Sequence, residues 1–310
     1  METASFREIL PAELHRQVSV NPKLLLIDTL PQEQFARRHL PRASNVCVYE
    51  VIFLQQVEAI TTDKATPIVI YGSCATSHEA TVAADKLARA GYGDLSVLKG
   101  GLDGWQAAGL PVEGSATTHI DDPGTIFRLP DGTYAVDVDK SIIGWTGRNP
   151  NGSHTGTVRL SGGKVFIAGE RGEGAFSIDI HSIRNTDLAG DELQPVLIAH
   201  LNSDDFFFTR IFPTATFTVQ GIERLEEPFV SSPNYIVTGS LELRGVKARL
   251  TFPATLVQME DGLLVAEAHF DIDRTRWNVI YGSARFFQYL GKHLVFDLIS
   301  LQVRVVAEKL

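Results

Sequence analysis

Cys74 is the residue of this chain whose surroundings best suit chemistry. It follows a short apolar run at 68–71 and precedes an alanine-rich helical pattern from His78 to Ala90. A loop between a strand and a helix directs successive backbone N–H groups toward an anion, and the helix dipole favours a thiolate there. Because the thiolate is the nucleophilic form of cysteine, the spacing predicts sulfur chemistry at Cys74. The anion-cradling loop consists of Cys74, Ala75, Thr76, Ser77, His78 and Glu79.

The other cysteine, Cys47, lies inside an apolar stretch at 43–49 that is typical of a buried strand. A free cysteine in such a place usually packs as a small hydrophobic residue. We therefore expect Cys47 to be inert and Cys74 to be the reactive thiol. The first residues lack the basic and apolar pattern of an export signal, and a reducing compartment keeps thiols free. The sequence thus predicts a cytoplasmic location.

The elements that position Cys74 alternate between short apolar runs and helical patterns, as in a parallel sheet with flanking helices. The apolar runs occupy residues 24–28, 43–49, 66–72 and 95–101. We therefore expect an α/β domain over residues 1–113. From Gly114 the composition shifts to Gly, Thr, Asp and Pro, which is typical of turns and linkers. A linker is predicted at 114–124.

Beyond residue 125 apolar residues recur at every second position, the period of a half-buried strand. About eight such segments occur, a number that can close into an antiparallel barrel holding packed side chains or one small ligand. One helix is expected at Glu192–Asn202. The sequence thus predicts a β-barrel domain over residues 125–310. The alternation selects as ligand-lining candidates Phe176, Ile178, Leu241, Leu243, Phe252, Phe270 and Leu298, with Phe206, Phe207, Phe212, Phe286 and Phe287 near the mouth. A register error of one residue would exchange interior and exterior.

The first domain resembles the rhodanese family over about residues 5–113. The stretches that carry the resemblance are LIDTLPQEQFARRHLPRASNV at 26–46 and VLKGGLDGWQAAGLPVE at 97–113. The resemblance implies that Cys74 takes sulfur from a sulfane donor such as thiosulfate. It would hold that sulfur as a persulfide and pass it to a thiol or to cyanide. Asp28 and His39 resemble residues that hold the loops of this family, so we expect them to have structural roles.

The loop has the length typical of sulfurtransferases, and it carries Ala80 where the related phosphatases have a catalytic arginine. Phosphatase activity is therefore disfavoured, because a phosphoryl transition state would lose its main charge partner. Ser77 replaces the usual loop glycine, and Leu30 replaces the usual arginine after the aspartate. We expect Glu79 to raise the pKa of the thiol. The alternative is a non-enzymatic module that docks partners or senses oxidants.

The second domain resembles the YceI-like family, whose members are lipocalin-like. The resemblance lies in YAVD at 134–137, GSHTGTV at 152–158, HLNSDDFF at 200–207, FPTATF at 212–217, TGSLELRGVKARLTFP at 238–253 and FDIDRTRWNVIYGS at 270–283. It implies a bound polyisoprenoid, isoprenoid quinone or fatty amphiphile, and no cofactor is required. His154, Asp204 and Arg274 match motif positions, for which we expect hydrogen bonding within the fold rather than contact with the ligand.

The remaining signals concern partners. With a net charge of −9 and no basic half, the chain is a poor candidate for nucleic-acid binding. No run of about 18 apolar residues predicts a membrane-spanning helix. The histidines of the barrel half lack metal-ligand spacing, so no metal site is predicted. The expected partners are a sulfur donor, a sulfur acceptor and an apolar small molecule, and the sequence leaves a homodimer open.

Overall fold

The computed structural model describes residues 6–117, 129–169, 171–226, 231–259 and 261–310. The chain divides into two compact units, residues 1–121 and 122–310. The predicted linker at 114–124 lies outside the described residues from residue 118 onward. Within the described ranges, no helix is long and apolar enough to cross a membrane.

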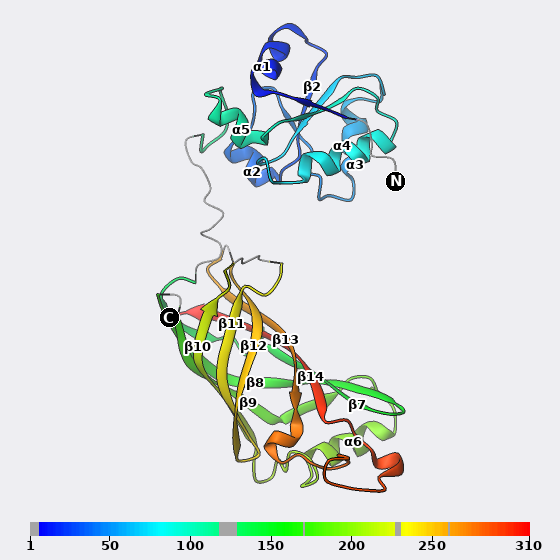
Figure 1. Ribbon diagram of the computed structural model, residues 1–310, viewed down its shortest axis with the longest axis vertical. Helices are drawn as coiled ribbons and strands as arrows, with labels where there is room; N and C mark the ends of the chain where they lie inside the picture. Colours follow the sequence, from blue (N-terminus) through cyan, green and yellow to red (C-terminus); the bar gives the residue numbers. More distant parts are fainter. Residues whose placement is uncertain (1–5, 118–128, 170, 227–230, 260) are drawn as a thin grey trace. The chain divides into compact units, whose positions relative to one another are not determined.

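The first unit is built on a five-stranded parallel sheet with the order β1-β5-β4-β2-β3 (Figure 1). Its strands are β1 (Arg7–Ile9), β2 (Leu25–Asp28), β3 (Ser44–Asn45), β4 (Ile68–Tyr71) and β5 (Leu95–Leu98). Its helices are α1 (Pro11–Val20), α2 (Gln32–Arg37), α3 (Phe53–Ile60), α4 (Glu79–Arg89) and α5 (Gly101–Ala107). The α/β prediction is thereby confirmed.

Both faces of this sheet are buried, as the continuous apolar strands require. Ile68 and Ile70 of β4 belong to a core cluster with α3 and α4. Val69 and Tyr71, which alternate with them, belong to a second cluster with α1 and α5. The sheet is therefore the middle of three layers, and the carboxyl end of β4 leads directly into the Cys74 loop.

The second unit is an antiparallel barrel. Its strands are β6 (Gly132–Val136), β7 (Ile142–Asn149), β8 (Gly152–Ala168), β9 (Arg171–Asn185), β10 (Thr214–Arg224), β11 (Tyr235–Leu243), β12 (Val246–Gln258), β13 (Leu264–Asp273) and β14 (Leu298–Lys309). The strands β8 to β14 pair in chain order, and β6 and β7 both lie between β14 and β8. Because β6 and β7 share one position, the nine strands form a closed barrel of eight positions. The predicted architecture is confirmed.

A helix between β9 and β10 and a tight turn between β11 and β12 lie at the same end of the barrel. The helix α6 (Leu193–Asn202) lies between β9 and β10, where the sequence predicted a helix. Arg244 and Gly245, with φ of 53° and 73°, join β11 to β12. Two consecutive positive φ values are typical of a type I′ hairpin turn. The Arg244 guanidinium donates hydrogen bonds of 2.6 Å to the carbonyl oxygens of Asp204 and Phe206, which ties this turn to the loop after α6.

Candidate functional sites

Cys74 lies in the loop between β4 and α4. The strand ends at Tyr71 and the helix begins at Glu79. The predicted anion-cradling residues therefore lie in this loop, except for Glu79, which is the first residue of α4. Cys74 is partly buried, and its Sγ lies 3.4 Å from the hydroxyl oxygen of Thr76. Ala75 and Thr76 are exposed. The sulfur therefore lies in a loop that solvent reaches.

The start of α5 fixes the backbone of this loop. The Leu102 amide donates a 2.9 Å hydrogen bond to the carbonyl oxygen of Gly72. Gly101 approaches so closely that a Cβ atom there would lie 2.7 Å from the same oxygen and 3.0 Å from the Cys74 nitrogen. Its φ of 58° also favours glycine. Gly101 thus lets two segments from different parts of the chain pack together and position the thiol.

Two serine hydroxyls bind the carboxylate of Glu79. Ser73 donates to Oε1 at 3.2 Å, and Ser77 donates to Oε2. Burial, followed by the charge of Glu79, raises the pKa of Tyr49, so this carboxylate also acts on that phenol. Ser77, which replaces the expected glycine, therefore stabilises the Glu79 carboxylate by donating a hydrogen bond to it.

The pKa of the Cys74 thiol is lowered from its ordinary value. The hydrogen bond with the Thr76 hydroxyl is the largest cause; burial opposes it, and the Thr76 amide, the Ser73 hydroxyl and the Ser77 amide add to the lowering. The increase expected from Glu79 does not decide the net direction, because the surrounding donors outweigh the opposing effects. The loop therefore favours the thiolate.

The other residues of the first domain that the sequence singled out lie within the fold. Cys47 is 8% exposed and belongs to the core. Asp28 is fully buried, and its Oδ1 accepts a 2.8 Å hydrogen bond from the Leu30 amide. Leu30 is itself buried, in place of the charged residue expected there. The His39 ring stacks on Phe35 at 3.8 Å, and its Nδ1 lies 2.7 Å from the Phe35 carbonyl oxygen. These contacts are structural.

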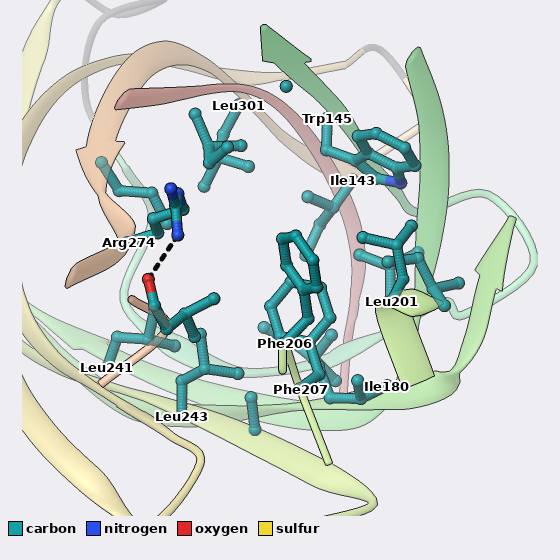
Figure 2. A pocket seen from close by; sticks show the side chains of 18 of the residues that line it. Ile143, Trp145, Ile180, Leu201, Phe206, Phe207, Leu241, Leu243, Arg274 and Leu301 are labelled. Carbon is teal, nitrogen blue, oxygen red and sulfur yellow. Dashed lines mark hydrogen bonds between the residues drawn. The ribbon is translucent and has the colours of Figure 1, made fainter. Parts of the chain in front are cut away.

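A cavity of about 410 Å³ occupies the barrel interior. Figure 2 shows side chains from several strands and from α6 pointing toward a shared space, among them Ile143, Leu201 and Leu301. Phe206 and Phe207, from the loop after α6, enter the same space. The barrel is thus not filled by its own side chains, and it encloses an apolar chamber.

Six of the seven predicted lining residues border this cavity: Phe176, Ile178, Leu241, Leu243, Phe252 and Phe270. The prediction for Leu298 is wrong, since this side chain is 51% exposed and does not border the cavity. Its neighbours Ile299 and Leu301 do border it. The inward-facing positions of β14 are odd-numbered, so an even-numbered residue at the start of the strand faces outward.

The aromatic residues expected at the mouth divide into two groups. Phe206 and Phe207 line the cavity, whereas Phe286 and Phe287 are 53% and 45% exposed and do not. Phe212 packs instead on the β11–β12 turn, where a Cβ atom at Gly245 would lie 3.0 Å from its ring. The loop after α6 therefore supplies the phenylalanines at this wall, whereas Phe286 and Phe287 of the segment after β13 do not take part.

Polar residues from the β7–β8 hairpin, from α6 and from the segment between β13 and β14 gather at one end of the cavity. We call this set the polar rim: Arg148, Asn149, His154, His200, Tyr281, Lys292 and His293. The Tyr281 hydroxyl lies 3.2 Å from Nδ1 of His293, and the rings of Tyr281 and His200 meet edge to face at 4.7 Å. Among the described residues around this cavity, none is Asp or Glu. His154, His200 and Tyr281 lie in stretches that carry the family resemblance, but sequence reasoning did not group the rim residues, because three distant segments build the rim.

Arg274 holds the segment that follows β13. It is 3% exposed, and its guanidinium donates to the carbonyl oxygens of Val279 at 2.6 Å, Val295 at 3.0 Å and Phe296 at 3.1 Å. Figure 2 shows its head group at the cavity wall with one of its hydrogen bonds. Asp297 lies 3.7 Å away and compensates the charge. Arg274 therefore clamps the wall of the cavity.

The two other motif residues also contact the protein itself. His154 Nδ1 lies 2.9 Å from Asp187 Oδ2, a contact that joins β8 to the segment that follows β9. Burial alone would raise the pKa of Asp187. Hydrogen bonds with the Thr155 amide, His154 and Asn185 outweigh burial and lower this pKa to about 2. Asp204 contributes its carbonyl oxygen to Arg244. In the part of the chain that the structure describes, no group of three or more His, Cys, Asp or Glu residues could hold a metal ion.

Comparison with protein families gives two matches. The YceI-like domain family matches residues 134–307, which is more than half of the chain. The rhodanese-like domain family matches residues 10–108. The two matches correspond to the barrel and to the unit that contains Cys74.

Three similar proteins each cover one part of the chain. The adenylyltransferase and sulfurtransferase UBA4 of Candida albicans is 35% identical over 98 residues, which are 31% of this chain and 22% of that protein. The chain thus spans less than a quarter of this relative. Burkholderia cenocepacia BcnA is 22% identical, over 56% of this chain and 99% of its own, with a TM-score of 0.45. A polyisoprenoid binding domain from Saccharophagus degradans is 15% identical, over 57% and 98%, with a TM-score of 0.41.

Proposed function

Because the chain belongs to the YceI-like family and carries a rhodanese-like domain before the barrel, we propose that the barrel binds one long apolar molecule in its interior. The ligand classes that fit are a polyisoprenoid, an isoprenoid quinone or a fatty amphiphile. The single observation that carries this proposal is the apolar cavity of about 410 Å³ in the barrel interior. Each methylene group moved from water into such a space contributes about 0.8 kcal/mol. A chain of several methylenes is therefore held without any specific polar contact.

The polar rim supports an amphiphile over a plain hydrocarbon. Arg148 and Lys292 carry positive charge, and Tyr281 with the histidines offers further hydrogen-bond donors. No carboxylate borders the cavity among the described residues, and the two carboxylates next to the rim, Asp187 and Asp205, are paired with His154 and His200. A head group that accepts hydrogen bonds, such as a carboxylate, a phosphate or a quinone carbonyl, suits this end of the cavity.

The test is native mass spectrometry of the purified full chain, followed by organic extraction. A retained apolar mass that extraction releases is the expected result. Ala215→Phe, which places a ring inside the cavity, should reduce retention, because Ala215 lines it and is 2% exposed. Ala175→Phe on the neighbouring strand is the matched control, since Ala175 is exposed. A chain that retains no ligand and takes up no hydrophobic probe would contradict the proposal.

For the first domain we propose persulfide chemistry at Cys74. The observation that favours it is a partly exposed thiol whose pKa is lowered by the loop. In this reaction the thiolate attacks the outer sulfur of thiosulfate and forms a new S–S bond. The original S–S bond breaks, and sulfite leaves with the electron pair. Cyanide or a thiolate then attacks the outer sulfur of the persulfide, and the Cys74 thiolate is released.

Intact mass spectrometry under denaturing conditions tests this second function. Thiosulfate treatment should add the mass of one sulfur atom to the wild type and to Cys47→Ser, but not to Cys74→Ser. Thiocyanate formation that depends on Cys74 would identify an enzyme. Equal background turnover in Cys74→Ser and wild type would instead support the alternative, a module that docks partners or senses oxidants through the same thiol.

A further inference from the structure

A second cavity lies deeper in the barrel. It has a volume of about 110 Å³, and its lining comes from β8 to β14 and is apolar except for Glu267. Leu129, Tyr134 and Tyr235 belong to the same core cluster as this lining. We call this cavity the end chamber and the larger one the main chamber. The polar rim belongs to the main chamber only.

Five residues border both chambers and therefore lie between them: Phe176, Phe217, Phe252, Val303 and Val305. The three phenylalanines make up most of this boundary. Phe176 and Phe217 are cross-strand partners on β9 and β10. The rings of Phe217 and Phe252 lie 5.7 Å apart, and Phe252 stacks on Phe270 of β13 at 4.1 Å. We call Phe176, Phe217 and Phe252 the aromatic partition.

Two glycines make room for these rings. A Cβ atom at Gly239 would lie 2.6 Å from Cζ of Phe217, and one at Gly163 would lie 2.6 Å from Cδ1 of Phe176. Because β11 has no side chain at position 239, the Phe217 ring extends over that strand toward Phe252 of β12. Glycine within a strand often marks such a close approach. The partition is thus specified by residues on five neighbouring strands, β8 to β12.

We propose that the aromatic partition sets the length of the apolar chain that the barrel accepts. The inference rests on the proposed ligand-binding function and adds its specificity determinant. A ligand whose head group lies at the polar rim extends its chain through the main chamber and ends at the rings. If a ring is removed, the two chambers join, and a longer chain gains additional buried surface.

The extra length follows from the strands. On β12 the end chamber extends from Phe252 to Leu256, a separation of four residues. At about 3.3 Å per residue this is about 13 Å along the strand, or about 10 Å along the barrel axis at the usual strand tilt of about 40°. Joining the chambers should therefore admit a chain longer by about this distance.

Isothermal titration calorimetry of the full chain with straight-chain 1-alkanols of increasing length tests the proposal. In the wild type, affinity should rise about fourfold per methylene, which corresponds to about 0.8 kcal/mol, and then stop rising at a limiting length. In Phe217→Ala the limit should move to longer alkanols. Ile178→Ala is the matched control, because Ile178 lines only the main chamber; it should keep the wild-type limit.

A double variant checks the cause of the shift. Ala266 lines only the end chamber, so adding Ala266→Leu to Phe217→Ala should bring the limit back toward the wild-type length. Phe217→Leu, which keeps an apolar side chain but removes the ring, provides the same test if Phe217→Ala loses its near-ultraviolet circular dichroism. An unchanged limit in both Phe217 variants would overturn the partition while leaving ligand binding intact. A wild type that binds none of the alkanols would overturn the binding function and the partition together.

Discussion

Replacing Arg274 with methionine should destabilise the barrel domain and loosen the wall of its cavity. The substitution keeps much of the side-chain length but removes every donor, so the carbonyl oxygens of Val279, Val295 and Phe296 lose their partner. A buried acceptor left without a partner costs about 1–3 kcal/mol. Three such acceptors give about 3–9 kcal/mol. The lower end is appropriate, because this segment lies near the surface, where water can satisfy part of the loss.

A loss of about 3 kcal/mol corresponds to a fall of about 6–12 °C in the melting temperature of a domain of this size. Differential scanning calorimetry of the full chain measures it, and hydrogen exchange with mass spectrometry assigns the affected transition. Exchange should accelerate at 279–297, because Arg274 holds this segment. Arg274→Lys should recover only part of the stability, since an ammonium group lacks the planar fork of guanidinium.

Arg210→Met provides the matched control, because Arg210 is exposed and surface substitutions usually change stability by less than about 0.5 kcal/mol. The reasoning would be refuted if Arg274→Met and Arg210→Met had equal stability. It would also be refuted if Arg274→Met abolished ligand binding with unchanged stability and exchange, since Arg274 would then be a ligand contact and not a clamp.

Three further predictions concern single residues. Thr76→Val removes the hydroxyl that contributes most to the lowered pKa of Cys74, so the pH midpoint of iodoacetamide alkylation should rise, and an unchanged midpoint would contradict this. Burial, the largest cause, raises the pKa of Asp28 to about 6, so the folded state binds more protons than the unfolded state between pH of about 4 and 6. The contribution of Asp28 to stability should then fall as pH rises through this window. In Asp28→Asn the free energy of unfolding, measured by urea titration, should depend less on pH between about 4 and 6. An unchanged pH dependence would count against this assignment. Ile299→Ser should weaken the binding of a hydrophobic probe more than Leu298→Ser does, because only Ile299 borders the cavity; equal effects would contradict this orientation.

The sequence was most informative where a local pattern determines the structure. The position of Cys74 between a strand and a helix could be predicted, because an apolar run, a short loop and a helical pattern follow one another in the chain. The balance of the effects on its pKa could not be predicted, because the position before a helix favoured a thiolate and a nearby carboxylate opposed it. Glu79 is close in sequence and suggested a raised pKa, whereas the hydroxyls of Thr76 and Ser73 and the backbone amides determine the net effect. Side-chain rotamers and loop geometry, which the sequence does not reveal, decide which groups face the sulfur.

The polar rim illustrates a second limit. Arg148 belongs to the β7–β8 hairpin, His200 belongs to α6, and Lys292 belongs to the segment before β14. No periodic pattern connects these residues, since they meet only after the barrel has closed. A sequence comparison can mark some of them as motif positions, but it does not tell which of them share a cavity.

The aromatic partition illustrates the difference between facing the interior and lying at a given depth. Alternation along β9 and β12 correctly places Phe176 and Phe252 inside the barrel, yet it assigns them the same role as Ile178 or Leu241. Depth depends on the register between strands and on their tilt, which shift equivalent positions from one strand to the next. The register brings Phe176 opposite Phe217, and Gly239 lets the Phe217 ring extend toward Phe252. A glycine that seems only to weaken a strand in the sequence therefore determines where the main chamber ends, and the length limit for alkanols would measure that contribution directly.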